Sequence, residues 1–449
     1  MNTSQKSIDM VNGPLLKNIF LFAVPIMFTS LLQMLFNAAD TVIVGKFSGE
    51  NALAAVGATS SIIFFLTSLF NGLSVGANVV IAQLFGEQNE KKISEAVHTA
   101  MLIAITGGIL LTVIAILIAR RILELMSTPS EIIDLSHLYL IIYFGGVISL
   151  IVYNFGAAIL RSKGDTKRPL YYLFASGILN VILNLIFVIV FKWSVAGVAL
   201  ATIISEGMSA LLVINTLIHE NDATKLNIRK LKLNVSIALD IMRVGIPAGI
   251  QTIVFSLSNI VVQSSLNSFD SAIIVAGNSA ALNIENFVYI GMSAFTQATI
   301  TFTSQNIGAK NYQAIKKILW TTFVLTFISG FSVSLVIWVF GRFFLSLYTN
   351  DIAVIDAGMV RLTYVTLLLV INGLLDVFVC SMRGMGNSLV PTIVMIIGIC
   401  VIRMCWLWFV FPRYSTLECI YICFPISWIV TTIVQYFLWL KTYHQFMSL

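Results

Sequence analysis

Five ionisable side chains lie within long apolar stretches of this sequence. The acids are Asp40, Glu206, Glu285 and Asp376, and the base is Arg403. An ionisable group inside a membrane span is costly and is therefore a functional candidate. Burial favours the protonated form of a carboxylate, whereas a nearby cation favours its charged form. We therefore predict that these acids exchange a proton or a sodium ion.

Asp40 is the strongest candidate because polar side chains accompany it. Gln33, Asn37 and Asp40 are spaced at i, i+4 and i+7, so on a helix they share one face. The alternative is a helix-end carboxylate near the outer surface.

Glu206 follows Thr202 by four residues. We interpret Glu206 either as part of a proton path or as a polar group near the inner opening.

Other polar residues within the apolar stretches are candidates for the wall of a substrate cavity. Apolar pockets with a few polar groups accept varied ligands, especially where methionine is present. The candidate cavity residues are Gln33, Asn37, Asn154, Asn259, Gln263 and Met292. The alternative for most methionines and aromatic residues here is packing against protein or lipid.

The elements that must position these residues are membrane-spanning helices. Of 449 residues, 58% are hydrophobic and 10% are charged, whereas soluble domains contain more than twice that share of charge. Mean hydropathy is +0.95, which argues against a soluble enzyme and against disorder. Apolar runs of about 20 residues can each cross a bilayer as a helix. We predict twelve such helices, at residues 15–45, 52–83, 93–119, 132–159, 169–191, 195–219, 240–267, 272–305, 314–342, 353–381, 388–411 and 417–442.

The distribution of Lys and Arg predicts the orientation of these helices. With the N-terminus inside the cell, 18 of the 26 Lys and Arg residues fall on the inside and 7 on the outside. We place Arg361 among the outside residues and Arg403 within a span. Positive charge concentrates on the cytoplasmic side. We therefore expect a multi-pass protein of the cell membrane with both termini in the cytoplasm, and the net charge of +6 needs no nucleic-acid partner.

An internal repeat divides the chain into two halves. The offset that separates Pro25 from Pro247 also relates Asn37 to Asn259, Gln83 to Gln305, Gly86 to Gly308, Asn89 to Asn311, Arg161 to Arg383, Gly164 to Gly386, and Pro169 to Pro391. Six crossings return the chain to the same side, so the repeats are parallel and related by a pseudo-two-fold axis along the membrane normal. This architecture is typical of secondary transporters. We predict an N-terminal lobe at 1–218, a cytoplasmic linker at 219–239 and a C-terminal lobe at 240–449.

Three segments carry a family resemblance. They are AVPIMFTSLLQMLFNAADTVIVG at 23–45, GLSVGANVVIAQLFG at 72–86, and LRSKGDTKRP at 160–169, which is echoed by MRGMGNSLVP at 382–391. Together they resemble the multidrug and toxic compound extrusion (MATE) family over nearly the whole chain. The resemblance implies an all-α membrane protein of the MOP superfamily, with a V-shaped pair of six-helix lobes and cation-coupled export of organic compounds.

The resemblance also implies a cation site in the first lobe, formed by Asp40, Asn180, Asn184 and Thr202. Oxygen ligands of this kind suit sodium. Many relatives have an aspartate where Asn184 stands, and the missing charge weakens the case for tight sodium binding. Proton coupling needs only Asp40, so the coupling ion is H+ or Na+. Interhelical hydrogen bonding is the alternative role for the asparagines.

The second lobe departs from the NorM-type branch of the family, so the chain is closer to the DinF-like branch. The acidic positions of the NorM-type branch correspond here to Phe255 and Asn372, which are not acidic. A different polar site could be formed by Glu285, Asn372, Asp376 and Arg403. A structural ion pair involving Arg403 is the alternative.

We therefore expect a secondary active antiporter, not an enzyme, that exports amphipathic, cationic organic compounds by alternating access. It would need no cofactor and no ATP, since nothing resembles a Walker motif, and it would act as a monomer in the bilayer. The alternative is a flippase for a lipid-linked oligosaccharide. That function calls for a strongly basic cavity, whereas the spans contain four acids and one predicted base.

Overall fold

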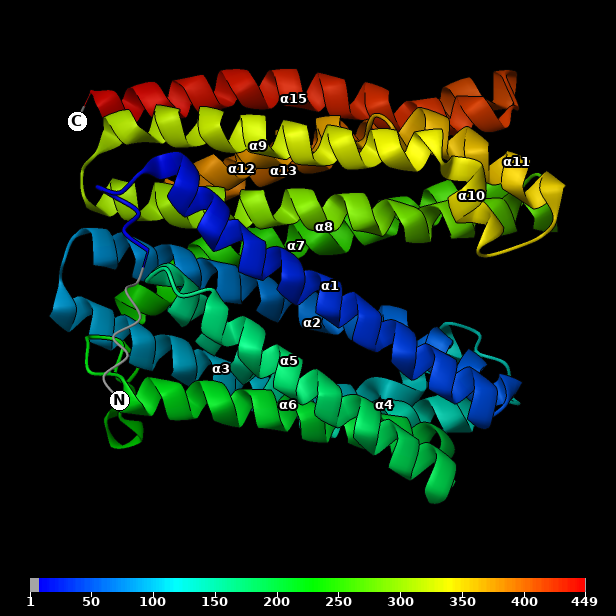
Figure 1. The fold of residues 1–449 in the computed structure, drawn as a ribbon, viewed down its shortest axis with the longest axis horizontal. Helices are drawn as coiled ribbons and strands as arrows, with labels where there is room; N and C mark the ends of the chain where they lie inside the picture. Colours follow the sequence, from blue (N-terminus) through cyan, green and yellow to red (C-terminus); the bar gives the residue numbers. More distant parts are fainter. Residues whose placement is uncertain (1–7, 449) are drawn as a thin grey trace. The chain divides into compact units, whose positions relative to one another are not determined.

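The computed structural model describes residues 8–448, and within that range it is helical without a strand (Figure 1). Twelve segments of the described chain are long and apolar enough to cross a membrane. Nine are single helices: α1 (Leu15–Phe47), α2 (Glu50–Gly86), α3 (Glu90–Leu125), α4 (Ile133–Ser162), α6 (Ser194–His219), α7 (Val235–Asn267), α8 (Ala272–Gly308), α9 (Tyr312–Val339) and α15 (Leu417–Met447).

Three spans change helical geometry along their length. One joins α5 (Lys167–Asn184) to the π-helix η1 (Leu185–Val190). Another runs from α11 (Ile352–Arg361) through the π-helix η3 (Leu362–Thr366) into α12 (Leu369–Gly384). The third contains α13 (Leu389–Met395), η4 (Ile396–Val401), α14 (Ile402–Cys405), η5 (Trp406–Val410) and η6 (Phe411–Arg413). Short helices outside the spans are η2 (Ile228–Lys230) and α10 (Gly341–Ser346).

The twelve predicted helices are confirmed, and most structural helices extend beyond the predicted apolar runs. For example, α3 begins at Glu90 rather than at residue 93, because Asn89 caps it by accepting a hydrogen bond from the Lys92 amide at 3.1 Å. Polar residues can continue a helix into water at no burial cost, so hydropathy alone underestimates helix length. The predicted start of the seventh helix at residue 240 is wrong for the same reason, since α7 begins at Val235.

The chain folds into two compact units that do not follow the predicted division at 219–239. Unit 1 contains Phe28–Gly249, and unit 2 contains Asp9–Met27 together with the chain from Ile250 onward. The first part of α1 therefore belongs with unit 2, and the first part of α7 belongs with unit 1. The two breaks are separated by the offset of the internal repeat, and each follows a helix-interior proline, Pro25 or Pro247. Proline removes a backbone hydrogen bond, so the helix is weakest there.

Each unit repeats the same internal packing. In unit 1, α2, α3 and α4 pack on one another, and α6 packs on both α4 and α5. In unit 2, α8, α9 and α12 pack in the same way, and α15 packs on both α12 and α13. The structure thus supports the internal repeat at the level of helix contacts.

Two glycines at repeat-related positions turn the chain before α5 and α13. Gly164 has φ +93° and Gly386 has φ +86°. This left-handed backbone conformation favours glycine because it has no Cβ. The repeat in LRSKGDTKRP and MRGMGNSLVP therefore preserves a turn geometry.

The first of these turns is tied to the linker that follows α6. Lys163 Nζ lies 2.9 Å from Glu220 Oε2 and 3.0 Å from Asp222 Oδ2. Burial tends to raise the pKa of Asp222, but hydrogen bonds from Thr224 and the charge of Lys163 hold that pKa below its ordinary value. Asp165 pairs with Arg168. Ion pairs therefore hold the start of the linker against the turn between α4 and α5 in unit 1.

Close backbone contact joins α2 to the first part of α7 within unit 1. A Cβ on Gly72 would lie 2.3 Å from the Gly249 nitrogen and 2.5 Å from the Gly245 oxygen. We expect Gly72→Ala to force the helices apart and to lower stability by about 1–3 kcal/mol. Thermal unfolding of the purified protein measures this. The control Gly57→Ala lies in the same helix with open space within 4 Å, and equal melting temperatures for the two variants would contradict this prediction.

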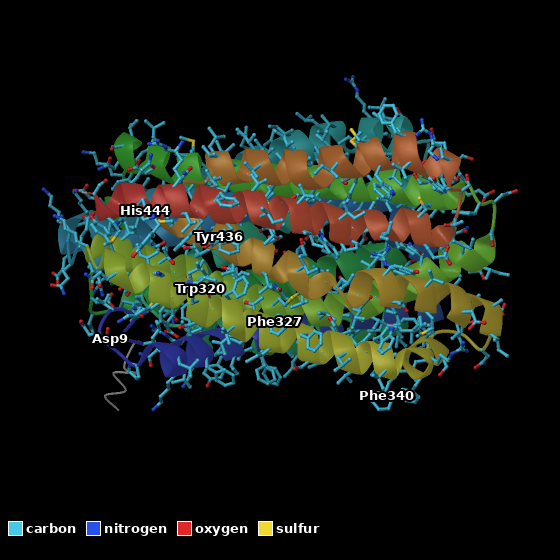
Figure 2. All side chains as sticks on the ribbon, turned by 90° about the horizontal axis from the view of Figure 1, so that it is seen from above. Asp9, Trp320, Phe327, Phe340, Tyr436 and His444 are labelled. Carbon is cyan, nitrogen blue, oxygen red and sulfur yellow. The ribbon has the colours of Figure 1, made fainter. Side chains whose placement is uncertain are left out.

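The outer face of α9 carries exposed aromatic side chains. Figure 2 shows Trp320 and Phe327 along this helix and Phe340 just beyond its end, and the three are 42%, 43% and 56% exposed. In water such a surface would be unfavourable. It is suited to contact with lipid chains, as expected of a membrane span.

Candidate functional site

The predicted first-lobe site is brought together in unit 1. Asn184 Nδ2 donates to Asp40 Oδ1 at 2.5 Å and is 3.2 Å from Asn180 Oδ1. Asn180 and Asn184 are 5% and 0% exposed, whereas Asp40 is half-buried. One turn of α5 separates the two asparagines, so they lie on the same face of that helix. The structure thus joins three of the four predicted residues.

Asn184 is the last residue of α5, and the π-helix η1 begins immediately after it. π-helical segments inside helices are often found at functional sites. The side-chain oxygen of Asn184 is buried and makes no hydrogen bond within residues 8–448. An orphaned oxygen beside a carboxylate fits a cation or the proton of a neutral Asp40, because either would supply the missing positive partner.

The fourth predicted residue lies apart from this hydrogen-bond network. The Thr202 hydroxyl donates to the Val198 carbonyl of its own helix at 3.0 Å. Its oxygen keeps a further lone pair for a ligand. Only one carboxylate belongs to the predicted set, and the described residues contain no cluster of three or more His, Cys, Asp or Glu side chains that could hold a metal. The oxygen ligands fit a weakly held monovalent ion better than a divalent metal.

A second acid extends the polar region of unit 1. Glu206 Oε2 is buried without a hydrogen bond to any described residue. Tyr139 lies within electrostatic range of both Asp40 and Glu206, and it stacks on Tyr143 with ring centroids 6.2 Å apart. Tyr139 was not predicted, because one tyrosine in an apolar stretch carries no distinctive signal. The two acids and Tyr139 therefore form one electrostatically connected group.

In unit 2 the main buried polar cluster is an ion pair. Glu285 receives two hydrogen bonds from Arg361, each 2.8 Å long, and one from Thr366 at 2.9 Å. Arg361 also donates to Asn278 Oδ1 at 2.7 Å, and Tyr421 donates to the same oxygen at 3.1 Å. Arg361 ends α11 and Thr366 ends the π-helix η3. Every oxygen of Glu285 therefore has a partner, as a stable buried charge pair requires.

This cluster corrects one of our predictions and rules out one alternative. Arg361 is not in an outside loop but lies within a span at 4% exposure. Glu285 pairs with Arg361 and not with Arg403. The error arose because a long basic side chain near the end of a span commonly extends to the membrane surface. The signal that could have identified Arg361 is its place inside the predicted helix 353–381.

The remaining residues of the predicted second-lobe site are dispersed. Asn372 and Asp376 are half-buried, and within the described chain neither is hydrogen-bonded to Glu285. The positive charge that acts on Asp376 is that of Arg383. Arg403 lies over the ring of Phe424, at 4.1 Å from its centroid. The predicted group is therefore not one hydrogen-bonded cluster.

The candidate cavity residues occupy different surroundings in their own units. In unit 1, Gln33 and Asn37 are exposed, and Asn154 donates to Asn71 at 2.9 Å. In unit 2, Asn259 is exposed, and Gln263 accepts from Asn278 at 3.0 Å. Met292 is 0% exposed, and Cβ atoms placed on Gly330 and Gly373 would meet its sulfur. Met292 is therefore a core residue, which corrects its prediction as a cavity residue.

A family model described as MatE matches this chain twice, at residues 25–186 and 247–409. The two matches begin at Pro25 and Pro247, the first pair of the internal repeat, and together they cover most of the chain. The chain belongs to the MATE family. The family is one of transport proteins, in agreement with the prediction that the chain is not an enzyme.

Relatives of this chain extend over almost its full length. It is 29% identical over 444 residues to the probable multidrug resistance protein YoeA of Bacillus subtilis, covering 95% of this chain and 94% of the relative. It is 25% identical over 394 residues to the multidrug export protein MepA of Staphylococcus aureus, covering 86% and 85%.

A solved structure has the same fold. It is described as the outward-facing conformation of a multidrug resistance MATE family transporter of the MOP superfamily. The TM-score is 0.92 at 21% sequence identity, with 99% of each chain covered. The all-α fold of the predicted class is therefore confirmed, with twelve candidate spans in the described residues.

Proposed function

We propose that this protein is a secondary active antiporter that exports amphipathic, cationic organic compounds in exchange for H+ or Na+. The observation that carries the proposal is the contact between Asp40 and Asn184, with a buried oxygen of Asn184 left unpaired beside it. A carboxylate in this setting binds a proton or cation in exchange for its amide partner. The multidrug names of its relatives support export as the direction.

Coupling follows from the way Asp40 links two elements. When Asp40 is ionised, the Asn184 amide stabilises it and ties α1 to α5. A proton or sodium ion on Asp40 weakens that hydrogen bond and changes the packing of α1 against α5. An ion and a substrate that favour different packings must affect each other's affinity reciprocally.

The flippase alternative gains no support from the named relatives. YoeA and MepA are described as a multidrug resistance protein and a multidrug export protein. The acids Asp40 and Glu206 in unit 1 also favour a positively charged ligand. We therefore propose a cationic substrate class, with the protein in the cell membrane, both termini in the cytoplasm and one chain sufficient for function.

The experiment that tests the proposal is efflux of the cationic dye ethidium from energised membrane vesicles. It is run under a proton gradient alone and then under a sodium gradient alone. We expect dye movement that depends on one of the two gradients and that collapses when an ionophore removes it. Dye movement that persists after both gradients are removed would contradict antiport.

A substitution at Asn184 distinguishes the two ions. Asn184→Asp places a second carboxylate beside Asp40, and two adjacent carboxylates attract sodium more strongly than one. If sodium is the coupling ion, we expect the sodium concentration for half-maximal efflux to fall about tenfold, which corresponds to about 1.4 kcal/mol. The matched control is Asn215→Asp, since Asn215 is an exposed residue of α6 and the side-chain partner of Asp40 is Asn184. An unchanged sodium response in Asn184→Asp would exclude sodium binding at Asp40.

A further inference from the structure

Arg403 is a buried cation of unit 2 without a carboxylate partner. It is 5% exposed and lies in the interior of the span Leu389–Arg413. Its Nε donates to Ser427 Oγ at 3.1 Å, and it forms no ion pair with any residue of the described chain. The ionisable neighbours that influence it are Cys400, Cys423 and Arg361, none of which is an acid.

A second buried arginine of unit 2, Arg383, has polar partners for its positive charge. Arg383 is 8% exposed, and its guanidinium donates to Gln251 Oε1 at 2.9 Å and to Ser388 Oγ at 3.3 Å. Its charge also acts on the carboxylate of Asp376. Arg403 has neither an acid nor a side-chain carbonyl of this kind, so its charge is the less satisfied of the two.

Two aromatic rings partly compensate the positive charge of Arg403 in place of a counter-ion. The Arg403 guanidinium lies 4.1 Å from the centroid of Phe424 and 5.6 Å from that of Trp428. Cation–π contacts of this kind are favourable but do not neutralise the charge. Arg361 also lies over Phe424, at 5.4 Å, so two guanidinium groups share one ring. Glu285 neutralises Arg361 alone, and the cluster retains one positive charge.

Within the described chain, the Arg403 guanidinium donates a hydrogen bond through Nε and leaves its two Nη atoms available. Ser427 accepts from Nε, and its own hydroxyl donates to the Phe424 carbonyl at 2.7 Å. The two Nη groups make no hydrogen bond to any residue in 8–448. They form the planar, two-pronged end of the guanidinium, which matches a carboxylate and also attracts a halide ion.

We propose that Arg403 is the anchor of an anion-binding site in unit 2, which accepts a single negatively charged group. This negatively charged group is either a free halide ion or the carboxylate of an organic molecule. An anion at the Nη edge would neutralise the excess charge of the cluster where a buried charge is most costly. The site is distinct from the acids of unit 1 and depends on neither the coupling ion nor the direction of transport.

The test uses the full-length purified protein and two heavy-atom probes, bromide and 4-bromobenzoate. Both quench indole fluorescence on contact, and Trp428 is 3% exposed, so it is shielded from probes in bulk solvent. We expect saturable quenching by at least one probe in the wild type, and loss of that saturable component in Trp428→Phe. Bound probe should also raise the melting temperature by about 2–4 °C.

Variants at Arg403 distinguish the two sources. Arg403→Met should abolish both the saturable quenching and the melting shift. Arg403→Lys keeps the charge but loses the planar edge, so it should retain a bromide response and lose most of a 4-bromobenzoate response. The control Arg413→Met removes an exposed arginine at the end of the same span and should respond as the wild type.

The quenching results either identify the bound anion or overturn the proposal. Saturable quenching by bromide alone identifies a halide site, and saturable quenching by 4-bromobenzoate alone identifies a carboxylate site. No saturable quenching of Trp428 by either probe in the wild type would overturn the proposal, even if Arg403→Met fails to fold. Equal responses in Arg403→Met and the wild type would overturn it as well.

Discussion

Replacing Asp40 with asparagine is expected to abolish gradient-driven efflux while the protein still folds. Asp40→Asn removes the carboxylate of the α1–α5 site but keeps its shape. Asn184 and Asn180 remain to hydrogen-bond the new amide. Without an ionisable group the site cannot bind a proton, and its affinity for sodium falls. We expect gradient-driven ethidium efflux to fall to the rate measured without a gradient.

The matched control for this experiment is Asp134→Asn. Asp134 is an exposed carboxylate that pairs with Arg120 at 2.7 Å, so its loss changes net charge by the same amount. Efflux in this variant should equal that of the wild type. Melting temperature and expression of both variants establish that they are folded. If Asp40→Asn and Asp134→Asn export ethidium equally well, Asp40 is not the coupling group.

Breaking the buried ion pair of unit 2 is expected to cost more stability than any surface change. Arg361→Met leaves Glu285 buried with Thr366 as its one remaining hydrogen-bond donor among its present partners. Removing one partner of a buried pair typically costs about 3–5 kcal/mol. The neutral double variant, Glu285→Gln with Arg361→Met, should recover a large part of this loss, because no buried charge is then left unpaired. Thermal and denaturant unfolding measure both variants.

A surface ion pair provides the comparison. Arg342 lies 2.7 Å from Asp356, with side-chain exposures of 68% and 52%. Solvent screens this pair, so Arg342→Met should cost about 0–1 kcal/mol. A similar loss for Arg361→Met would show that the Glu285–Arg361 pair contributes little to folding. A double variant less stable than Arg361→Met would show that its polar groups, rather than its charge balance, hold unit 2 together.

Composition and periodicity were sufficient to predict the helical scaffold. Bilayer thickness sets the minimum length of an apolar run, and each of the twelve predicted runs corresponds to a span. The repeat offset was detectable because it preserves turn glycines and helix prolines, whose backbone requirements do not depend on distant contacts. Gly164 and Gly386 illustrate this, since both adopt positive φ.

The residues of the first-lobe site were predictable for a related reason. Asn180 and Asn184 are one turn apart, so local helical geometry already places them on one face. Their approach to Asp40 was implied by the family resemblance, and the structure shows the contact at 2.5 Å. The role of Met292 was not predictable in this way. Its burial depends on Gly330 and Gly373, which lie on other helices.

The sequence by itself determined that this is a repeated, twelve-span membrane protein of a transporter family, with acids inside its spans. Only the tertiary structure decided which charges meet. Glu285 and Arg361 lie far apart in the chain, and π-helical segments beside Arg361 and Asn184 alter the rotation of the helix between one turn and the next. Burial of an ionic group depends on every helix that surrounds it. The pairing of Arg361, and the lack of an acidic partner for Arg403 in the described chain, therefore become visible only when the helices are packed.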